Sequence, residues 1–239
     1  STPFEISGGN PYLDPETSFG FDAALEWYFA PASLLSVGVY HRQIDNVIYP
    51  GSSTVDGSVY APGLIPAGTP TTFNSFFNGK DGEMSGLELN FMGTAEDWLP
   101  APFDGLGASG NITFVDSSFY APNLGASYSM PGTSDTVYNA SVFYEKFGVS
   151  ARLNYQFRSA WLSTTENDSL TEYWGDTERV DASLRYTLPN PVLGTNVTLA
   201  LNGNNLTDER DLRYVNSTRT PNQYEGFGRR WVASIRIDY

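Results

Sequence analysis

The last residues of the chain alternate between two kinds of side chain. From Arg230 onward, one set of alternate positions is apolar or aromatic: Trp231, Ala233, Ile235, Ile237 and Tyr239. The other set is mostly polar: Arg230, Val232, Ser234, Arg236 and Asp238. Because successive side chains of an extended strand point to opposite faces, this pattern predicts a β-strand that ends on an aromatic residue.

The same alternation recurs upstream and predicts an all-β chain of about nine strands. It is clearest where Leu153 and Tyr155 alternate with Arg152 and Asn154. Gly and Pro lie mostly between the alternating stretches, as turn chemistry requires. The predicted strands form one antiparallel meander and cover residues 17–29, 34–48, 80–93, 106–119, 134–145, 149–161, 177–188, 196–206 and 228–239.

The predicted connections alternate between short and long. The long ones cover residues 49–79, 116–135, 162–176 and 207–227. This alternation, with strands of about ten residues, is typical of a transmembrane β-barrel with short periplasmic turns and long external loops. A soluble carbohydrate-binding β-sandwich also has alternating strands separated by turns, and it stays open as an alternative.

Composition excludes several functional classes. The 239 residues include no Cys and one His, so disulfides and thiolate metal sites are absent. A catalytic triad would depend on His41, which we interpret as a side chain near a membrane interface. The formal net charge of -14 repels nucleic acid. The sequence contains no motif for a catalytic pair, a metal site or a cofactor. We therefore expect neither an enzyme nor a nucleic-acid-binding protein.

Four segments together resemble the C-terminal part of a TonB-dependent outer-membrane receptor. Residues 10–18 read Asn-Pro-Tyr-Leu-Asp-Pro-Glu-Thr-Ser, which resembles a loop-to-strand segment of that family. Residues 86–89, Gly-Leu-Glu-Leu, resemble one of its strands. Residues 204–209, Asn-Asn-Leu-Thr-Asp-Glu, resemble a strand exit, and residues 228–239 resemble the family's terminal strand, with Tyr239 where Phe is commoner.

Two further segments are most similar to a proteobacterial subgroup linked to carbohydrate uptake. They cover residues 106–116 and 144–152. Within the family, this resemblance favours an oligosaccharide as the ligand. A ferric siderophore is the alternative, although the excess of acidic residues disfavours anionic ferric chelates.

The family resemblance implies an antiparallel barrel of about 22 strands with a plug folded inside it. Residues 1–239 would be its C-terminal part, without the plug and the N-terminal strands. The implied function is active transport: external loops capture a scarce solute, and TonB, acting through the missing N-terminal part, drives its import. The implied partners are outer-membrane lipid, the plug, the remaining strands, TonB and a small ligand. The N-terminus of this piece would lie outside and its C-terminus in the periplasm.

Three groups of residues receive roles in this interpretation. The ligand contacts are aromatic residues of the long connections, which stack on a sugar ring and hydrogen-bond at their edges: Trp161, Tyr173, Trp174, Tyr214 and Tyr224. The lumen-facing residues that contact the plug are charged: Glu88, Arg152, Arg185, Arg230 and Arg236. The C-terminal assembly signal consists of Trp231, Ile235, Ile237 and Tyr239. Solvated loop aromatics and mutual pairing of the charges are the structural alternatives.

Overall fold

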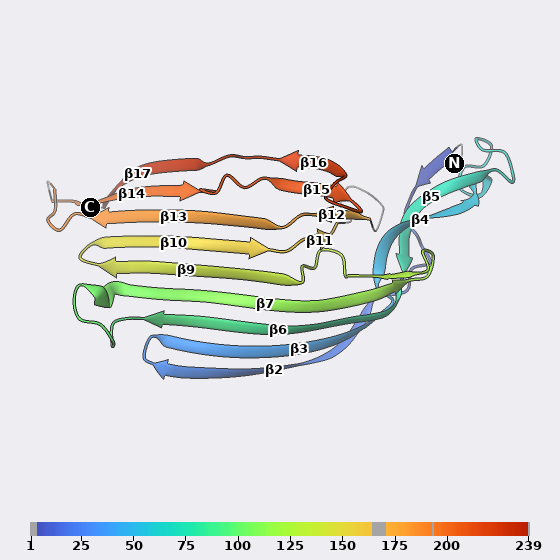
Figure 1. The fold of residues 1–239 in the computed structure, drawn as a ribbon. Coiled ribbons are helices and arrows are strands. Elements are labelled where there is room, and N and C mark those ends of the chain that lie inside the picture. Colours follow the sequence, from blue (N-terminus) through green and yellow to red (C-terminus); the bar gives the residue numbers. More distant parts are fainter. Residues whose placement is uncertain (1–3, 164–170, 193, 239) are drawn as a thin grey trace.

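A single antiparallel meander dominates the computed structural model, which describes residues 4–163, 171–192 and 194–238 (Figure 1). Nine strands form it, each hydrogen-bonded to the next one along the chain that belongs to this sheet. Each matches a predicted strand to within a few residues, so the predicted meander is confirmed. The strands are β2 (Thr17–Ala30), β3 (Ser33–Asp45), β6 (Lys80–Thr94), β7 (Leu106–Ala121), β9 (Thr136–Lys146), β10 (Val149–Arg158), β13 (Thr177–Thr187), β14 (Asn196–Asn204) and β17 (Arg230–Asp238).

The prediction of nine strands was too low, because the described residues form seventeen. The other strands lie in segments predicted to be irregular: β1 (Phe4–Ser7), β4 (Ile48–Asp56), β5 (Pro70–Asn78), β8 (Ala126–Tyr128), β11 (Trp161–Leu162), β12 (Glu172–Trp174), β15 (Asp211–Val215) and β16 (Pro221–Glu225). Two short 3₁₀ turns, η1 (Gly57–Val59) and η2 (Phe103–Gly105), complete the elements. Most of these extra strands are short, and all except β8 form by pairing with one another, which a period-two pattern does not reveal.

The extra strands build two small sheets beside the meander. One has the order β1-β5-β4, with β1 parallel to β5, and the other has the order β11-β12-β15-β16. Strand β8 pairs with β7 and extends the main sheet. Among the described residues, no helix is long and apolar enough to cross a membrane.

The register places the alternating side chains of all nine meander strands on two continuous faces. Leu184 lies opposite Leu201, and Leu199 lies opposite Ile235. We call this side the apolar face; the predicted outward residues share it: Leu153, Tyr155, Leu184, Tyr186, Leu199, Ile235 and Ile237. We call the other side the polar face; the predicted inward residues share it: Arg152, Asn154, Arg185 and Arg236.

The apolar face is open to its surroundings. Ile235 is 68% exposed and Leu25 is 72% exposed, and no second sheet of the described chain packs over them. A β-sandwich buries such residues between its two sheets. The sandwich alternative is therefore wrong, and the exposed belt fits a lipid environment.

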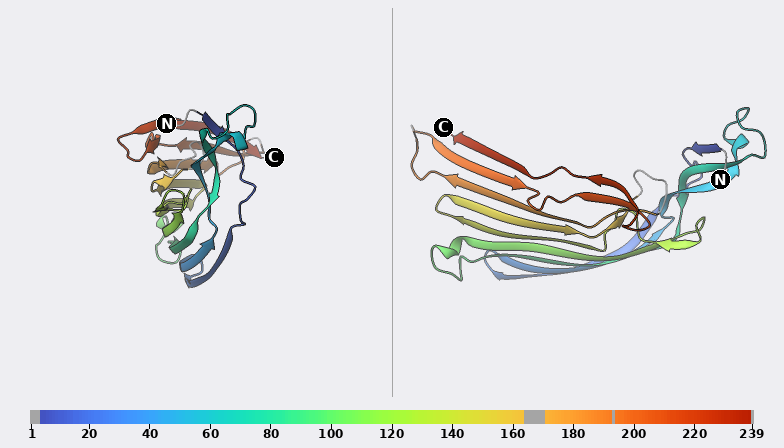
Figure 2. Two further views of the ribbon diagram at one scale, coloured as in Figure 1. Left: turned by 90° about the vertical axis from the view of Figure 1, so that its right-hand side faces the viewer. Right: turned by 45° about the horizontal axis from the view of Figure 1, so that its top comes forward.

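The buried core lies at the end of the meander where the long connections gather. It consists of Val47, Tyr49, Phe119, Ala121, Met130 and Leu162. Phe119 and Ala121 project from the polar face, where Ile44 and Met84 also pack against the cluster. The long connections thus pack against one end of the polar face. Figure 2 shows them gathered at that end of the curved sheet.

The opposite end of the meander carries the short connections. The β9–β10 hairpin turns through Phe147 and Gly148, which both have positive φ, as a two-residue turn of the right twist requires. A Cβ on Gly148 would lie 2.5 Å from the carbonyl oxygen of Thr187. The connection 95–105 is the longest of this group and contains η2.

The two faces are distinguished by arginine substitution. We expect Leu184→Arg, in the middle of the apolar face, to destabilise the barrel by about 2–4 kcal/mol because it places a charge in hydrocarbon. Asn202→Arg, on the polar face of the neighbouring strand, is the matched control and should assemble normally. The measurement is the folded fraction of the full receptor in outer-membrane preparations. Normal assembly of Leu184→Arg together with failure of Asn202→Arg would show that the two faces are inverted.

Candidate functional site

All five aromatic residues predicted to contact ligand lie on one small sheet at the long-connection end. We call the sheet β11-β12-β15-β16 the loop sheet. Register pairs Trp161 with Trp174 and Tyr173 with Tyr214, while Tyr224 lies opposite Leu212. Segments that are far apart in sequence thus bring the predicted contacts together, although no ligand tests their role.

The loop sheet separates its tyrosines from its tryptophans. Tyr173 and Tyr214 stack on one face with ring centroids 5.5 Å apart, and Tyr224 on the same face is 65% exposed. Burial raises the pKa of both Tyr173 and Tyr214, so their hydroxyls stay protonated and able to donate at neutral pH. Tyr173 also packs against the buried core. Tyr224 is therefore the most accessible of the five.

The two tryptophans form part of a four-layer stack with arginine. The rings of Trp161 and Trp174 lie 6.1 Å apart and 18° from parallel. The Arg158 guanidinium carbon lies 4.5 Å from the Trp161 ring centre, and that of Arg213 lies 5.0 Å from the Trp174 ring centre. Cation–π attraction stabilises this arrangement. Guanidinium groups cover ring faces that a sugar would need, so the indole edges are the parts left for ligand.

A buried ion pair between Arg213 and Glu172 anchors the loop sheet. Both side chains are 1% exposed, and Arg213 also donates to the Gln223 side chain at 2.7 Å. Sequence reasoning missed this pair, because Glu172 and Arg213 lie in different long connections and no local pattern relates them. Removing one partner of such a pair typically costs 3–5 kcal/mol, since the other charge stays buried.

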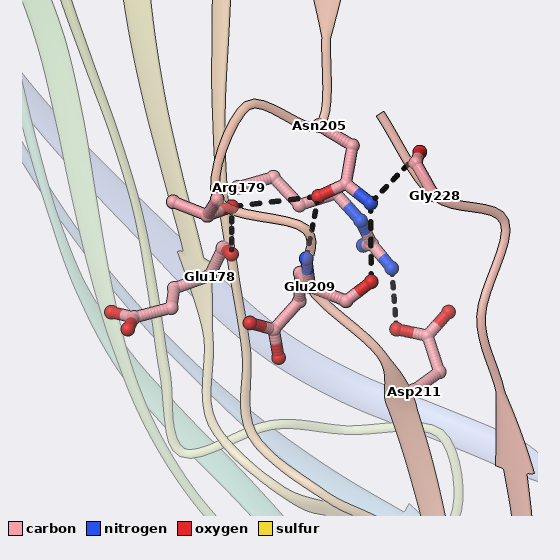
Figure 3. Close-up of polar contacts among 7 residues, drawn as sticks. Glu178, Arg179, Asn205, Glu209, Asp211 and Gly228 are labelled. Carbon is pink, nitrogen blue, oxygen red and sulfur yellow. Dashed lines mark hydrogen bonds and ion pairs between the residues drawn. The ribbon is translucent and has the colours of Figure 1, made fainter. Parts of the chain in front are cut away.

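The segment 204–209 makes a tight exit from β14 that Asn205 holds in place (Figure 3). Asn205 has φ of 52°, which Asn tolerates better than most residues. Its side-chain oxygen accepts from the Glu209 amide at 2.8 Å, and its side-chain nitrogen donates to the carbonyls of Glu209 at 3.1 Å and Gly228 at 3.4 Å. Its own amide donates to Asp181 at 2.8 Å. One residue thus links the exit from β14 to β13 and to the segment that precedes β17.

Charged groups surround this exit. Arg179 forms an ion pair with Asp211, and Glu209 lies close to both. Burial, followed by the nearby Glu178 carboxylate, raises the pKa of Glu209, while Arg179 opposes the shift. No group of three or more metal-binding side chains is placed to hold an ion within the described part of the chain.

The charged residues predicted to face the plug lie on the polar face, and two of them have partners within the chain. Arg152 lies 3.9 Å from Glu145 and 4.6 Å from the Phe143 ring centre. Arg236 pairs with Asp238 at 2.9 Å. The remaining three are placed by register: Glu88 opposite Thr113, Arg185 opposite Ala200, and Arg230 opposite Asn204. Mutual pairing is thus present, and contact with a plug stays a prediction.

The proposed assembly signal and His41 both lie on the apolar face. Trp231, Ile235 and Ile237 are 58%, 68% and 52% exposed there, and Tyr239 lies outside the described residues. His41 shares a hydrogen bond of 2.8 Å with the Ser85 hydroxyl, and its ring lies 5.8 Å from that of Phe21. The interfacial position expected for His41 stays a prediction.

A row of uncharged hydrogen-bonding side chains crosses the polar face. The strand register aligns Ser36, Asn90, Asn111, Asn139 and Gln156 on five adjacent strands. Asn90 donates to Ser36 at 3.2 Å, and Asn139 donates to Asn111 at 3.0 Å. We call this set the amide row. A hollow of about 340 Å³ lies against it. The sequence alone did not reveal the row, because it exists only once the register is known.

Asp56 closes the long connection between β4 and β5. Its carboxylate accepts from the Ser58 amide at 3.0 Å, the Ser58 hydroxyl at 2.9 Å and the Gly68 amide at 3.0 Å. The hydrogen bond from Gly68 and those from Ser58 lower the pKa of Asp56 below its ordinary value of 3.8. The carboxylate therefore stabilises the closed connection above that value, and the effect is lost as pH falls through the lowered pKa.

We expect acid to open this connection without unfolding the meander. A nitroxide label on Leu64→Cys reports it, because Leu64 is 85% exposed and the chain has no other Cys. The label should become more mobile as pH falls below 3.8, and Asp56→Ala should show that mobility at neutral pH. Equal label mobility in Asp56→Ala and the parent at neutral pH would contradict the role of Asp56.

Asn205 variants separate its backbone role from its hydrogen bonds. Asn205→Gly keeps the positive φ without strain but loses the side-chain bonds, whereas Asn205→Ala loses both. We expect the thermal stability of the full receptor to fall in the order Asn, Gly, Ala, with about 1–2 kcal/mol separating Ala from Gly. Circular dichroism melting in detergent measures it. Equal melting of Gly and Ala variants would exclude backbone strain at this position.

Comparison with known proteins identifies the family of the chain. A family model described as the TonB dependent receptor-like β-barrel matches residues 1–206. No curated protein matches the chain.

Several solved structures share the fold. A mutant of the ferric enterobactin receptor from Pseudomonas aeruginosa has 16% identity and a TM-score of 0.57, over 93% of this chain and 31% of that one. The ferric preacinetobactin receptor from Acinetobacter baumannii has 13% identity and a TM-score of 0.59, over 93% and 29%. The FrpB iron transporter from Neisseria meningitidis has 12% identity and a TM-score of 0.55, over 98% and 32%.

The chain therefore spans about a third of the length of these structures. The comparisons give no support to the carbohydrate-type subgroup. The family match covers most of the chain, and the meander with its exposed apolar face agrees with it. The chain belongs to the TonB-dependent receptor β-barrels, a family of the bacterial outer membrane.

Proposed function

We propose that this chain is the C-terminal part of a receptor that captures a scarce solute outside the cell and imports it with energy supplied through TonB. The long connections, with the loop sheet and the buried core, lie on the external side, as long loops do in outer-membrane barrels. The short connections and the C-terminus then lie in the periplasm, and residue 1 lies outside.

The two edge strands of the meander require further strands to pair with inside a membrane. Strands β2 and β17 are the two edges of the meander. Unpaired backbone groups are not tolerated in hydrocarbon, so these edges pair with the remaining strands of the receptor. A plug domain then lies inside the barrel, whose lumen the polar face lines, and TonB acts on the receptor through the N-terminal part.

We infer that the solute is a neutral oligosaccharide, and the amide row is the observation that carries this inference. Asn and Gln side chains both donate and accept hydrogen bonds, as sugar hydroxyls do, and they carry no charge. Two arginines at the long-connection end are already paired, Arg213 with Glu172 and Arg179 with Asp211. A formal net charge of -14 also opposes anionic ligands.

A ferric siderophore is the second candidate. Two of the matched structures are described as ferric enterobactin and ferric preacinetobactin receptors. At the long-connection end of this chain, Arg210, Arg219 and Arg229 are exposed in the connections around β15 and β16. These side chains offer positive charge to an anionic chelate.

Aromatic substitutions test capture at the loop sheet. We expect Tyr224→Ala to weaken binding by about 1–3 kcal/mol, or about 5- to 150-fold, because an exposed stacking contact is lost. Trp174→Ala should instead lower the thermal stability, because it breaks the arginine–tryptophan stack. Phe147→Ala, on a short turn, is the matched control and should bind normally. A binding loss only in Phe147→Ala would mean that ligand enters from the other side.

Titration of the full receptor with two ligand classes separates the candidates. A panel of neutral oligosaccharides is compared with a ferric catecholate chelate by calorimetry. We expect an oligosaccharide to bind and Arg219→Gln to leave its affinity unchanged. Binding of the ferric chelate alone, weakened by Arg219→Gln, would establish the siderophore alternative.

A further inference from the structure

The apolar face carries a furrow along β7 where small residues interrupt the belt of large ones. Ala108 and Gly110 lie on β7, and Gly93 lies opposite Ala108 on β6. Larger side chains border them, including Phe91 on β6 and Val142 on β9. Two hollows of about 470 and 350 Å³ follow this line, and Phe91 borders both. All strands around the furrow are present and paired, so it does not arise from an open sheet edge.

The turn after β6 closes the furrow at the short-connection end. The amides of Trp98 and Leu99 donate to the Ala95 carbonyl at 3.0 and 2.9 Å, which fixes a tight turn. This turn places Trp98 and Leu99 in the lining of the larger hollow. Trp98 is 65% exposed, and Trp is enriched where a membrane protein meets the lipid headgroups. The closed end thus lies at the level of the headgroups.

The dimensions of the furrow fit one hydrocarbon chain. The furrow has Ala108 and Gly110 at its centre and the larger Leu106 and Ile112 at its two ends, and the stretch from Leu106 to Ile112 spans about 20 Å at a strand rise of 3.3 Å per residue. Half of the hydrocarbon core of a bilayer is about 15 Å thick, and a tilted strand needs slightly more length to cross it. The floor of the furrow is about one strand spacing wide, roughly 5 Å. A single extended acyl chain matches both dimensions.

Van der Waals packing favours one lipid acyl chain that stays bound in this furrow. Lipid tails are as apolar as the lining, so contact area and fit, more than water exclusion, decide where a tail binds. An unfilled groove loses dispersion contacts along its walls. The bulky neighbours hold mobile lipids away from the floor, whereas one chain lying in the furrow contacts floor and walls together.

Charge at the closed end selects the headgroup. Glu96 and Asp97 are exposed on the turn beside Trp98. Their carboxylates attract an ammonium group and repel an anionic headgroup. The short-connection end lies on the periplasmic side of such barrels, where the leaflet is phospholipid. The charge and the side both favour a zwitterionic phospholipid that carries a primary ammonium.

We propose that the β7 furrow is a binding site for one phosphatidylethanolamine molecule of the periplasmic leaflet, with an acyl chain over Ala108 and Gly110 and its headgroup beside Glu96 and Asp97. This site depends on the membrane placement of the family and not on the identity of the transported solute. A lipid retained there would pack against the sheet beside the connection 95–105, the longest of the short connections.

A filling substitution tests the site directly. The full receptor is purified in mild detergent, supplied with phosphatidylethanolamine, and analysed by native mass spectrometry for retained lipid. Ala108→Leu fills the floor and should lose the retained lipid. Ala23→Leu adds the same bulk to the apolar face on β2, away from the furrow, and should keep it. Equal retention in Ala108→Leu and the parent would overturn the proposal.

A headgroup test does not depend on filling the furrow. The double substitution Glu96→Lys with Asp97→Lys leaves the floor intact but reverses the charge at its closed end. We expect it to retain phosphatidylglycerol in preference to phosphatidylethanolamine, the opposite of the parent receptor. The same headgroup preference in both proteins, or retention of lipid A instead of phospholipid, would contradict the assigned headgroup position and leaflet.

Discussion

Continuous backbone pairing across the nine meander strands is the constraint on which the rest of the structure depends. A bilayer offers no water to unpaired amides, so the strands must pair without interruption while they cross it. Pairing fixes register, and register decides that Leu184, Leu201 and Ala233 share a face while Arg185 and Ser234 share the other. A shift of one residue would reverse every assignment. The two faces therefore arise together from a single alignment.

The long connections solve a different problem, because they must hold shape without the support of lipid. They do so with a small buried core, the Arg213–Glu172 ion pair and the stack of Arg158, Trp161 and Trp174. The core and the ion pair join different connections, whereas the stack links the end of β10 to β11 and β12 within one connection. The long connections are thus stabilised by contacts with one another as well as within themselves, with the end of the polar face as the platform.

Sequence alone predicted the spanning strands well, because alternation is a local signal that lipid on one side and a polar interior on the other impose on each strand. It did not predict β4 and β5, whose Gly, Ser and Thr residues carry no apolar stripe. In the candidate site, too, local features could be predicted from the sequence and contacts between strands could not. Aromatic residues in the long connections were recognised by type, but the guanidinium groups that cover Trp161 and Trp174 were not, because cross-strand neighbours depend on register. The amide row escaped notice for the same reason.

The buried core at the long-connection end has a consequence for recognition by antibodies, phages and toxins. Val47 follows β3, Phe119 lies near the end of β7 and Leu162 lies in β11, so the surface above them is a conformational epitope that short peptides do not reproduce. Exposed side chains of other segments at this end, such as Tyr12 at 88% and Leu64 at 85% exposure, contribute little to packing. Antigenic variation is therefore free to accumulate at these tips while the architecture that presents them stays constant.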